Sequence, residues 1–326
     1  MSMEPDPGEF ELIRRFFLKK NASRDPKVLL GIGDDAAVLA VPNGMELVAA
    51  VDTIVSGRHF LEGASARSIG HRALAVNLSD MAAMGAAPAW ATLALTMPGA
   101  DVSWLEEFSS GLLELAAEYG VELVGGDTTL GPLTVSVQIL GLVPAGTALR
   151  RDGARAGDLL AVSGTLGDAA AGLTFSRQRM LGPTADMAAL IQRFEYPAPR
   201  VRLGLAARGV ANAAMDLSDG LVGDLPKLAQ ASGLAAHVDV EKLPLSAAMR
   251  GAAGSQQARD WALGGGDDYE LLFAISPESF PVLERSAGQL NLTLTPIGQL
   301  RAGAGVTWSL NGEEFAPGVS GYDHFG

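Results

Sequence analysis

The sequence of 326 residues contains no cysteine. This absence excludes disulfide bonds, thiolate catalysis and zinc sites built from cysteine ligands. Basic residues are also scarce, because 24 Lys and Arg stand against 37 Asp and Glu, for a formal net charge of −13. The absence of a basic stripe argues against broad binding to nucleic acid or to an anionic membrane. A phosphate substrate stays compatible with this charge, since bound Mg²⁺ can reverse the local sign of a site.

The sequence also lacks a clear membrane-spanning or export segment. Its start, MSMEPDPGEF, carries acidic residues and no long apolar region, unlike a signal peptide. Residues 81–100 carry no charged side chain and are about long enough to span a bilayer. However, they are mostly Ala and Thr, and they contain Gly85, Pro88, Pro98 and Gly99, which disfavour a continuous helix. A helix that ends at Gly85, followed by a buried strand over residues 90–97, is the expected structure. We therefore expect a soluble cytoplasmic protein.

The common nucleotide-binding signatures are missing as well. No G-x-x-x-x-G-K-[ST] loop occurs, and no kinase-type H-R-D loop. GIGDDA at 31–36 fits the dinucleotide pattern G-x-G-x-x-A, but that glycine loop must open a helix. Here AAVLAV reaches the turn sequence Pro42-Asn43-Gly44 too soon for a crossover helix. We reject the dinucleotide-binding interpretation.

Aspartates in Gly/Ser/Thr-rich segments are the main feature that is present. Glycines let a backbone approach a ligand closely, and gathered carboxylates repel one another unless cations neutralise them. Mg²⁺ prefers oxygen ligands and is commonly shared with substrate phosphates. The sequence therefore predicts several Mg²⁺ ions around a nucleotide. The predicted metal ligands, each in a short loop beside a strand-like run, are Asp35, Asp52, Asp80, Asp127, Asp216 and Asp219.

Each aspartate taken alone has an ordinary structural explanation, because Asp caps helices and forms turns. Asp219 can cap the helix after Gly220, and Asp127 can form an Asx-turn before Thr128. The loop SGTLGD at 163–168 suits a phosphate site and a packed strand-to-helix turn equally. Capping does not require glycines beside so many acidic residues, so the set as a whole favours metal binding.

Four further residues are candidates for binding. His59 follows VDTIVSGR and either contacts substrate or has a structural role. Arg151, in the linker-like segment 150–158, either clamps a phosphate or is a solvated charge. Asp267 in GGGDDYELLF can meet a cationic substrate, and Tyr322 in the terminal GYDHF either docks over a pocket or packs.

Hydrophobic periodicity predicts the order of the elements. Helices are expected at 9–20, 65–84, 167–176, 199–209 and 220–232, with one to Tyr119 that starts with a Ser103/Glu106 capping box. A hairpin is expected over 39–51, and strands at 121–124, 133–143, 159–162, 213–217 and 235–240. The fold class is α/β or α+β with mixed sheets. We expect two domains, residues 1–148 and residues 149–326.

The motifs, taken in order, resemble the thiamine-monophosphate kinase family of the aminoimidazole-ribonucleotide synthetase-like superfamily. The resemblance extends from GEFELI at residue 8 to GYDHF at residue 325. Its more specific blocks are GRHF, AVNLSDMAAMGA and the terminal GYDHF. Its other blocks are GIGDDAAVL, LVGGDTT, SGTLGDAAAGL, MDLSDGL and GDDYEL.

The resemblance implies ATP-dependent phosphorylation of thiamine monophosphate to thiamine diphosphate. It implies an N-terminal domain that binds ATP and Mg²⁺ and forms a homodimer, and a C-terminal α/β domain. The six aspartates would hold the metals, and Asp52, Asp80 and Asp127 would neutralise charge during catalysis. By the same resemblance, ATP contacts come from Gly126, Asp127, Arg151 and Ser218. Thiamine phosphate contacts come from His59, Asp267 and Tyr322.

The chain departs from the family pattern at two places. Ala50 and Val51 stand where the family has hydroxyl residues before the aspartate, and Asp267 stands where the family has glutamate. Two other functions stay open from the sequence. One is a sister reaction of the superfamily, amidine-forming or selenophosphate-type, and the other is a non-catalytic acidic protein that binds cations.

Overall fold

The computed structural model describes residues 9–18, 25–178 and 182–324. The chain forms two compact units. Unit 1 comprises Met1–Met81 and Ala87–Ala145, and unit 2 comprises Ala82–Ala86 and Gly146–Gly326. None of the helices formed by the described residues has the length and apolar character needed to cross a bilayer.

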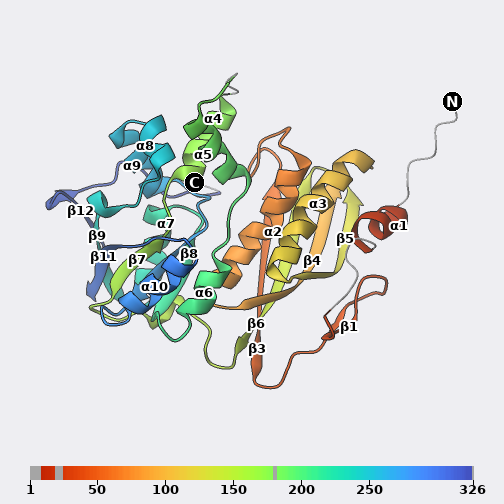
Figure 1. Ribbon diagram of the computed structural model, residues 1–326, viewed down its shortest axis with the longest axis horizontal. Coiled ribbons are helices and arrows are strands. Elements are labelled where there is room, and N and C mark those ends of the chain that lie inside the picture. The colour runs from red at the N-terminus through yellow and green to blue at the C-terminus, as the bar shows by residue number, and fades with distance from the viewer. Residues whose placement is uncertain (1–8, 19–24, 179–181, 325–326) are drawn as a thin grey trace. The chain divides into compact units, whose positions relative to one another are not determined.

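Unit 1 is built on a four-stranded sheet of order β3-β6-β4-β5, which is mixed because only β4 and β5 pair in parallel. Helices α2 and α3 lie along this sheet (Figure 1). A separate two-stranded ribbon pairs β1 with β2. The elements are α1 (Glu9–Leu12), η1 (Ile13–Leu18), β1 (Val28–Leu30), β2 (Val38–Leu39), β3 (Met45–Val55), α2 (Ala66–Ala83), β4 (Ala87–Met97), α3 (Val102–Tyr119), β5 (Glu122–Leu130) and β6 (Thr134–Pro144).

Two glycines let α2 and α3 approach each other closely. A Cβ on Gly70 of α2 would overlap the carbonyl oxygen of Phe108, and a Cβ on Gly111 of α3 would overlap that of Arg67. The core beneath is large and apolar, with Leu74, Leu105 and other side chains almost completely buried. Close helix packing thus explains why glycine interrupts two otherwise regular helices.

The predicted ends of α2 and α3 are largely confirmed. Gly85 takes a positive φ of 61° after α2, and Gly120 takes a left-handed conformation after α3. The predicted capping box is wrong, because the N-cap of α3 is Asp101, whose carboxylate accepts the Trp104 N–H. The Ser103 hydroxyl donates to the same carboxylate instead of capping the helix.

Two other local predictions for unit 1 need correction. The sequence around Pro42-Asn43-Gly44 does turn, but β2 pairs with β1 and β3 pairs with β6, so residues 39–51 are not a hairpin. The ribbon instead packs on a small core that includes Trp90. The expected helix 9–20 is a short α-helix followed by the π-helix η1, and its last two residues, 19 and 20, lie outside the described residues.

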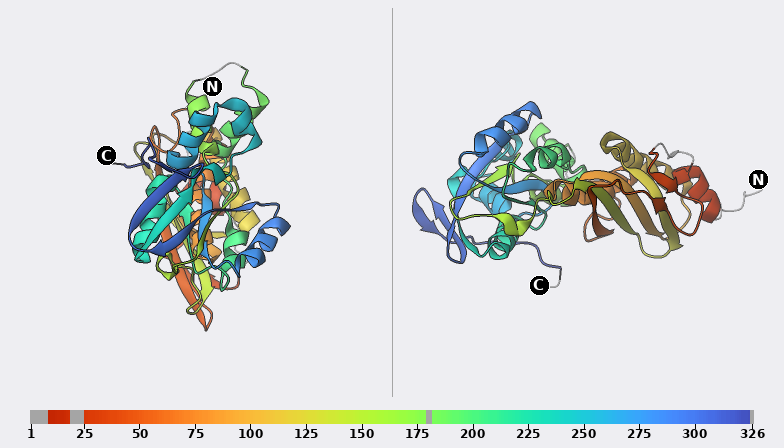
Figure 2. Two further views of the ribbon diagram at one scale, coloured as in Figure 1. Left: turned by 90° about the vertical axis from the view of Figure 1, so that its left-hand side faces the viewer. Right: turned by 90° about the horizontal axis from the view of Figure 1, so that it is seen from below.

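Unit 2 contains a seven-stranded mixed sheet of order β13-β12-β9-β11-β7-β10-β8. Figure 2 shows this sheet and its helices from two further directions. The elements are η2 (Arg151–Gly153), β7 (Leu159–Ser163), α4 (Asp168–Arg177), α5 (Ala185–Glu195), α6 (Val201–Ala207), β8 (Ala213–Leu217), α7 (Leu221–Ala231), β9 (Leu234–Asp239), η3 (Val240–Lys242), α8 (Ala247–Ala252), α9 (Ser255–Gly264), β10 (Glu270–Ile275), α10 (Phe280–Gln289), β11 (Leu294–Ala302), β12 (Gly305–Leu310) and β13 (Glu313–Phe315).

The centre of unit 2 is apolar and continuous. Strands β7, β8 and β10 contribute a large buried cluster, and α7 packs on it through Leu221, Leu225 and Leu228. A smaller cluster around Phe175 joins α4, α5, α8 and α9, which lie together in Figure 1. Alternating strands and helices, which the sequence predicted for this half, therefore form one mixed sheet with its helices.

The predicted linker 150–158 is an integral part of unit 2. Arg151 lies in the 3₁₀-helix η2, and its carbonyl oxygen accepts the Ser232 hydroxyl at 2.7 Å. Asp158 is almost completely buried, and its carboxylate accepts the side-chain amide of Asn212 and the Arg155 N–H. The segment is thus joined to unit 2 through Asp158 and η2, while its other charged side chains, including the Arg150–Asp152 ion pair, are exposed.

Candidate functional site

Two glycine motifs that are far apart in the sequence meet in unit 1. Gly125, Gly126, Asp127 and Thr128 of β5 line a small pocket together with Ile32 of the GIGDD segment. A Cβ on Gly126 would overlap the backbone of Leu93 on β4, so only glycine fits there. Close packing of β5 on β4 therefore explains Gly126, and the approach of its backbone to a phosphate stays a prediction.

Two further motifs of unit 1 are joined by a hydrogen bond. The backbone N–H of Asp52 on β3 donates to Asn77 Oδ1 at 3.1 Å, and Asn77 is fully buried in α2. Asp80 lies one turn further along the same helix and is half-buried. The VDT segment of β3 and the NLSD segment of α2, which are far apart in the sequence, are thus in direct contact.

His59 lies in the turn that follows β3. The Val55 N–H donates to His59 Nδ1 at 3.0 Å, while the His59 N–H donates to the Val55 carbonyl oxygen. Because Nδ1 accepts, a neutral His59 carries its proton on Nε2. The turn fixes the orientation of the His59 ring and leaves Nε2 as the donor atom of the neutral ring. His59 can therefore stabilise the turn and also contact a substrate.

The expectation that all six aspartates lie in loops is wrong for four of them. Asp52 and Asp127 lie within strands β3 and β5, Asp80 lies within α2, and Asp216 lies within β8. Asp35 and Asp219 lie outside helices and strands, as expected. At Asp127 the strand β5 extends through the glycine motif because its pairing with β4 continues there, and Asp80 lies within the continuous helix α2.

In unit 2 the end of β8 holds a compact turn. The carboxylate of Asp224, in the first turn of α7, accepts the N–H groups of Ser218 and Asp219 at 3.0 and 2.9 Å. Lys227 bridges this carboxylate and that of Asp219, at 2.9 and 2.7 Å. Burial raises the pKa of Asp224, although hydrogen bonds from Lys227 and Asp219 oppose that effect. Asp219 therefore does not cap α7, which has Gly220 at its N-cap.

Sequence reasoning missed Asp224 and Lys227. An acidic residue in the first turn of a helix that follows a Ser-Asp-Gly turn is a usable signal, because such a carboxylate can reach back to free N–H groups. The contact between Lys227 and Asp219 has no comparable signal in the sequence, because it depends on the direction in which α7 extends from the turn.

The glycine loop before β10 is held against this same turn. The Asp267 N–H donates to the Ser218 carbonyl oxygen, and the Tyr269 N–H donates to that of Leu217, both at 2.9 Å. Asp267 and Tyr269 take positive φ values of 69° and 50°, which are uncommon for residues other than glycine. The Tyr269 hydroxyl also donates to Asp267 Oδ1 at 3.1 Å. The loop thus presents Asp267 in a defined orientation.

The terminal segment docks on the same turn. The Tyr322 N–H donates to the Asp219 carbonyl oxygen at 2.9 Å, and Gly321 lies against Gly223 of α7. The Tyr322 ring is exposed and makes an edge contact with His324. Four predicted binding residues of unit 2, Ser218, Asp219, Asp267 and Tyr322, are therefore neighbours. Phe325 of the same motif lies outside the described residues.

The N-terminus of α4 is already occupied by a protein carboxylate. Asp268 is almost completely buried, and its carboxylate accepts the Gly167 N–H at 2.6 Å and the Ala169 N–H at 3.4 Å. Burial raises the pKa of Asp268 well above its usual value. Of the two alternatives for the loop at 163–168, the packed turn is therefore correct in this structure.

A buried ion cluster fixes the start of β10. The Glu270 carboxylate accepts hydrogen bonds from Arg200 Nε at 2.7 Å, from Arg193 at 3.0 Å and from the Ser163 hydroxyl at 2.6 Å. Glu270 has no exposed surface, so these partners are needed to offset the cost of burying its charge. This cluster anchors the strand that directly follows Asp267.

The six predicted metal ligands divide between the units. Asp35, Asp52, Asp80 and Asp127 belong to unit 1, whereas Asp216 and Asp219 belong to unit 2. Within the described ranges, no group of three or more His, Asp or Glu side chains is placed to hold a metal ion. The donors are all carboxylate oxygens, which is the ligand type that Mg²⁺ prefers, so their chemistry fits this ion.

Comparison with known proteins identifies the family of the chain. Residues 33–143 match the family AIR synthase related protein, N-terminal domain, and residues 155–308 match the family AIR synthase related protein, C-terminal domain. Thiamine-monophosphate kinase from Salmonella typhimurium is 47% identical over 98% of both chains. The chain belongs to the thiamine-monophosphate kinase family.

Solved structures agree with this assignment. Thiamine-monophosphate kinase from Stenotrophomonas maltophilia has a TM-score of 0.87 and 48% identity, covering 94% of this chain and 98% of the other. AaThiL complexed with AMPPCP and TMP has a TM-score of 0.78 and 34% identity, covering 88% and 89%. The resemblance inferred from the motifs, the α/β fold class with mixed sheets and the phosphotransferase class are confirmed.

Proposed function

We propose that this protein transfers the γ-phosphoryl group of ATP to thiamine monophosphate and forms thiamine diphosphate and ADP. The observation that carries the proposal is 47% identity to a thiamine-monophosphate kinase over 98% of both chains. The presence of AMPPCP and TMP in the AaThiL structure supports the same pair of substrates. This similarity also disfavours the sister reactions of the superfamily and a non-catalytic role.

Charge neutralisation is the main task of such a site, because both substrates are polyanions. We assign Asp35, Asp52, Asp80, Asp127, Asp216 and Asp219 as carboxylates that hold Mg²⁺. Bound Mg²⁺ supplies positive charge to the phosphates and to the negative charge that develops during transfer. Of these aspartates, Asp52, Asp80 and Asp127 have the predicted role in catalysis.

The remaining contacts follow the resemblance. Gly126, Asp127, Arg151 and Ser218 contact ATP. Asp267 and Tyr322 contact thiamine monophosphate, and the Tyr269 hydroxyl holds the Asp267 carboxylate in place. The left-handed backbone at residue 267 is better tolerated by Asp than by most residues, which suits the aspartate found where the family has glutamate.

His59 is proposed to bind the substrate phosphate through Nε2. Because the Val55 N–H occupies Nδ1, the neutral ring donates from Nε2 and cannot accept a proton at Nδ1 without losing that bond. This geometry favours a hydrogen-bond donor to a phosphate oxygen over a general base.

The transfer step itself needs no strong base. A phosphate monoester has a second pKa of about 6, so its oxygen is largely ionised at neutral pH. That oxygen attacks the γ-phosphorus in line, a new P–O bond forms, and the bond from the γ-phosphorus to the bridging oxygen breaks. The electron pair leaves with ADP. The protein orients the two phosphates and stabilises their charge.

We also propose that the protein acts as a cytoplasmic homodimer. Most exposed large apolar side chains of the described residues belong to unit 1, among them Leu29, Leu47, Val51 and Leu130. Leu47 and Val51 lie on the same exposed face of β3, because strand residues an even number of positions apart share a face, and a second copy of the chain is the partner that the family resemblance implies.

The experiment that tests the activity is ADP release by the purified protein with ATP, Mg²⁺ and thiamine monophosphate. Thiamine alone and no acceptor serve as controls, and the product is identified by chromatography. We expect thiamine diphosphate only from the monophosphate and only with Mg²⁺. ATP binding without turnover would point to a sister reaction. A rise in thermal stability with added cation but not with ATP would instead indicate a non-catalytic cation-binding protein.

Variants test the assigned aspartates. Asp52→Asn and Asp80→Asn are expected to lower kcat by a factor on the order of 100 or more, because they remove charge from the phosphate site. Glu118→Gln, an exposed acidic position on α3, is the matched control and is expected to keep normal turnover. An Asp52→Asn variant with unchanged kcat would contradict the assignment, provided its unfolding temperature is also unchanged.

A further inference from the structure

One face of the sheet in unit 2 carries a group of polar side chains that the proposed function does not use. They lie on β9 and β12, which pair in parallel near one edge of the sheet (Figure 1). His237 stands opposite Thr307 in this pairing, and Asp239 stands opposite Ser309. Paired residues share a face of a sheet, and so do residues two positions apart along a strand. All four side chains therefore project from the same face.

This face is opposite to the main core of unit 2. Val238 and Trp308, which alternate with the polar residues along the two strands, belong to the apolar cluster on which α7 packs. His237 and Asp239 keep 23% and 25% of their side-chain surface exposed, whereas Ser309 is buried. The polar group is therefore sheltered by the sheet but still open to a small solute.

Three side-chain atoms of this group meet at nearly equal distances. His237 Nε2 lies 3.4 Å from Asp239 Oδ1 and 3.3 Å from Ser309 Oγ, and Ser309 Oγ lies 3.2 Å from the same Oδ1. Ligands about 2.0 Å from a tetrahedral Zn²⁺ ion are about 3.3 Å from one another. The three atoms thus form a triangle of the size that one face of a zinc tetrahedron requires.

The second ring nitrogen of His237 fixes where the neutral ring carries its proton. The Thr307 hydroxyl donates to the Ala236 carbonyl oxygen at 3.2 Å. The hydroxyl oxygen is therefore the acceptor for His237 Nδ1, 3.0 Å away, and Nδ1 carries the proton. Nε2 then presents a lone pair to Asp239 and Ser309, and this is the form in which an imidazole binds a metal ion.

The triangle holds more acceptors than donors. Ser309 has one hydroxyl proton, which it can donate either to Nε2 or to the Asp239 carboxylate. A hydrogen bond from Lys242 to Asp239 Oδ2, at 2.7 Å, lowers the pKa of Asp239, so this carboxyl group is ionised at neutral pH. A lone pair and a carboxylate oxygen 3.4 Å apart repel each other unless a cation lies between them. A proton on Nε2 or a metal ion can supply that charge.

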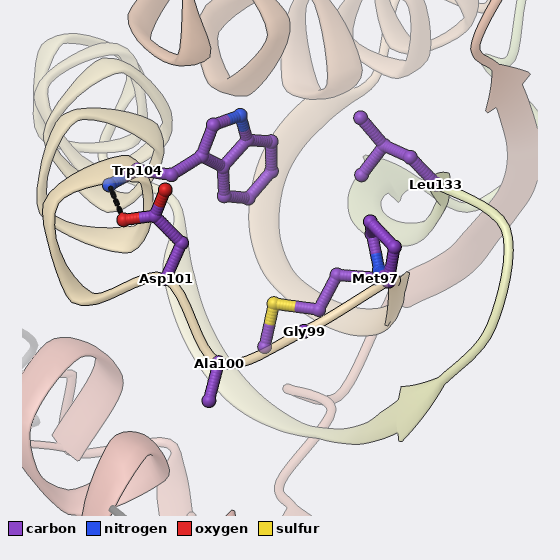
Figure 3. Close-up of a pocket in the computed structure, with 7 residues that line it drawn as sticks. Met97, Gly99, Ala100, Asp101, Trp104 and Leu133 are labelled. Carbon is purple, nitrogen blue, oxygen red and sulfur yellow. Dashed lines mark hydrogen bonds between the residues drawn. The ribbon is translucent and has the colours of Figure 1, made fainter. Parts of the chain in front are cut away.

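The pocket where β4 ends and α3 begins in unit 1 has a different chemistry (Figure 3). It has a volume of about 460 Å³, and Met97, Trp104 and Leu133 give it an apolar wall. Asp101 is the carboxylate among its lining residues, and its Oδ1 already accepts the Trp104 N–H and the Ser103 hydroxyl. A transition metal ion needs several ligands, which the face of β9 and β12 supplies and this pocket does not.

The triangle is also separate from the proposed magnesium ligands of unit 2, Asp216 and Asp219. Asp216 lies on β8, and three strands, β11, β7 and β10, stand between β8 and β9 in the sheet. Neighbouring strands are about 4.8 Å apart, so four such steps separate β8 from β9 by about 19 Å. Mg²⁺ prefers ligand sets made of oxygen, whereas an imidazole nitrogen suits Zn²⁺.

We propose that His237, Asp239 and Ser309 bind one Zn²⁺ ion, and that Thr307 is the positioning residue that leaves the lone pair on Nε2. Water completes the tetrahedron on the open side of the sheet. The ion joins β9 to β12 and stabilises this edge of unit 2. Its role is structural, and the phosphoryl transfer proposed above does not require it.

Titration calorimetry of the full-length protein with Zn²⁺ at pH 8 tests the proposal. Each titration contains excess Mg²⁺, so that carboxylate sites that prefer Mg²⁺ are occupied before Zn²⁺ is added. The variants are His237→Gln, Asp239→Asn and Thr307→Val, and His71→Gln on α2 is the matched histidine control. Circular dichroism reports on the folding of each variant. A parallel titration uses Co²⁺, whose visible absorption is strong in a tetrahedral site and weak in an octahedral one.

We expect one Zn²⁺ ion per chain in wild type and in His71→Gln. Thr307→Val should weaken Zn²⁺ binding by about tenfold, because it removes the acceptor that orients the ring. His237→Gln and Asp239→Asn remove ligands and should weaken binding further. Zn²⁺ should raise the unfolding temperature of wild type but not that of His237→Gln, and turnover with Mg²⁺ should be equal in these two proteins.

Other results overturn the proposal in distinguishable ways. Equal Zn²⁺ affinity in wild type and folded His237→Gln would place the ion elsewhere on the chain. No binding of Zn²⁺ by wild type at pH 8 would show that a proton and the Ser309 hydroxyl alone satisfy the group. Unchanged affinity in Thr307→Val would contradict its positioning role, and a weak Co²⁺ spectrum would contradict the tetrahedral geometry.

Discussion

At the scale of single residues, carboxylates that the sequence did not single out hold the candidate site in shape. Asp224 and Asp268 each accept two backbone N–H groups from a neighbouring segment. The segment bonded by Asp224 carries Ser218 and Asp219, which are assigned to ligands, whereas Asp268 itself directly follows the assigned residue Asp267. Buried carboxylates therefore act here as positioning groups for residues that we propose contact the substrates.

The first prediction concerns Asp224, whose Oδ2 accepts the N–H groups of Ser218 and Asp219. Asp224→Ala leaves both groups without this partner, and each unpaired group costs about 1–3 kcal/mol. We expect lower stability in urea unfolding and a higher KM for ATP, because Ser218 is assigned to ATP. Asp224→Asn keeps an acceptor oxygen and should restore most of both properties. Equal effects of the two substitutions would contradict a hydrogen-bonding role.

The second prediction concerns Asp268 and pH. Its folded-state pKa is raised by burial, so as pH rises the unfolded chain loses the proton first and stability falls between the unfolded pKa of about 4 and the folded pKa. Each unit of this shift costs about 1.4 kcal/mol above that range. Asp268→Asn removes the titration and keeps an acceptor for the Gly167 N–H.

Urea unfolding of wild type and Asp268→Asn from pH 4 to pH 7 measures the effect. We expect the stability of the asparagine variant relative to wild type to increase as pH rises. Parallel stability curves for the two proteins would show that the carboxyl group has the same pKa in the folded and unfolded chains.

At the scale of elements, features that depend on neighbouring residues could be predicted, whereas features that depend on distant residues could not. Strand 213–217 and the ends of α2 and α3 at Gly85 and Gly120 follow from local patterns, because glycine fits the left-handed backbone after a helix. The hairpin over 39–51 failed because strand pairing is non-local: β3 pairs with β6, about 90 residues away in sequence. The capping box failed because Asp101 competes for the same N–H groups.

The candidate site shows the same division between local and non-local information. Motif residues such as Asp127 and Asp267 could be chosen from the sequence, because glycines and acids occur beside apolar runs. Their contacts could not, since the bonds from Asp267 to Ser218 and from Tyr322 to Asp219 join segments that are far apart in sequence. Pocket residues such as Trp104 carry no motif, because a tryptophan on a helix is usually a core residue.

The third prediction tests the close packing of α2 on α3. Gly111→Ala places a Cβ where it overlaps the Arg67 carbonyl oxygen, so the helices must separate. Overpacking of this kind costs about 1–3 kcal/mol, although alanine has the higher helix propensity. Gly288→Ala, in α10, is the matched control because nothing lies within 4 Å of the added Cβ.

Thermal unfolding of the two variants separates packing from propensity. Gly111→Ala should be less stable than wild type, while Gly288→Ala should be equally stable or slightly more stable. If both substitutions raise stability, the helices are not in close contact at Gly111.

At the scale of the whole molecule, exposed apolar residues are distributed unequally. Unit 1 exposes several large apolar side chains, among them Leu29, Leu47, Val51 and Leu130. In the described part of unit 2, the exposed large side chains of this kind are Val282 and Tyr322. Val51 directly precedes Asp52 and so lies close to the proposed phosphate site, and Leu47 is four residues earlier on β3. Leu47 is therefore the better position for a test of self-association, because its replacement leaves the assigned metal ligands intact.

The last prediction is that Leu47→Lys weakens the homodimer. Leu47 has 47% of its surface exposed, and burying a lysine ammonium at an apolar contact carries a large desolvation cost. Light scattering after size-exclusion chromatography should give twice the mass of one chain for wild type and a concentration-dependent shift toward one chain for the variant. Val282→Lys, at a 43% exposed position of unit 2, is the control and should stay dimeric. A wild-type protein with the mass of one chain at every concentration would contradict the proposed homodimer, and equal masses for wild type and Leu47→Lys would place the contact elsewhere on the chain.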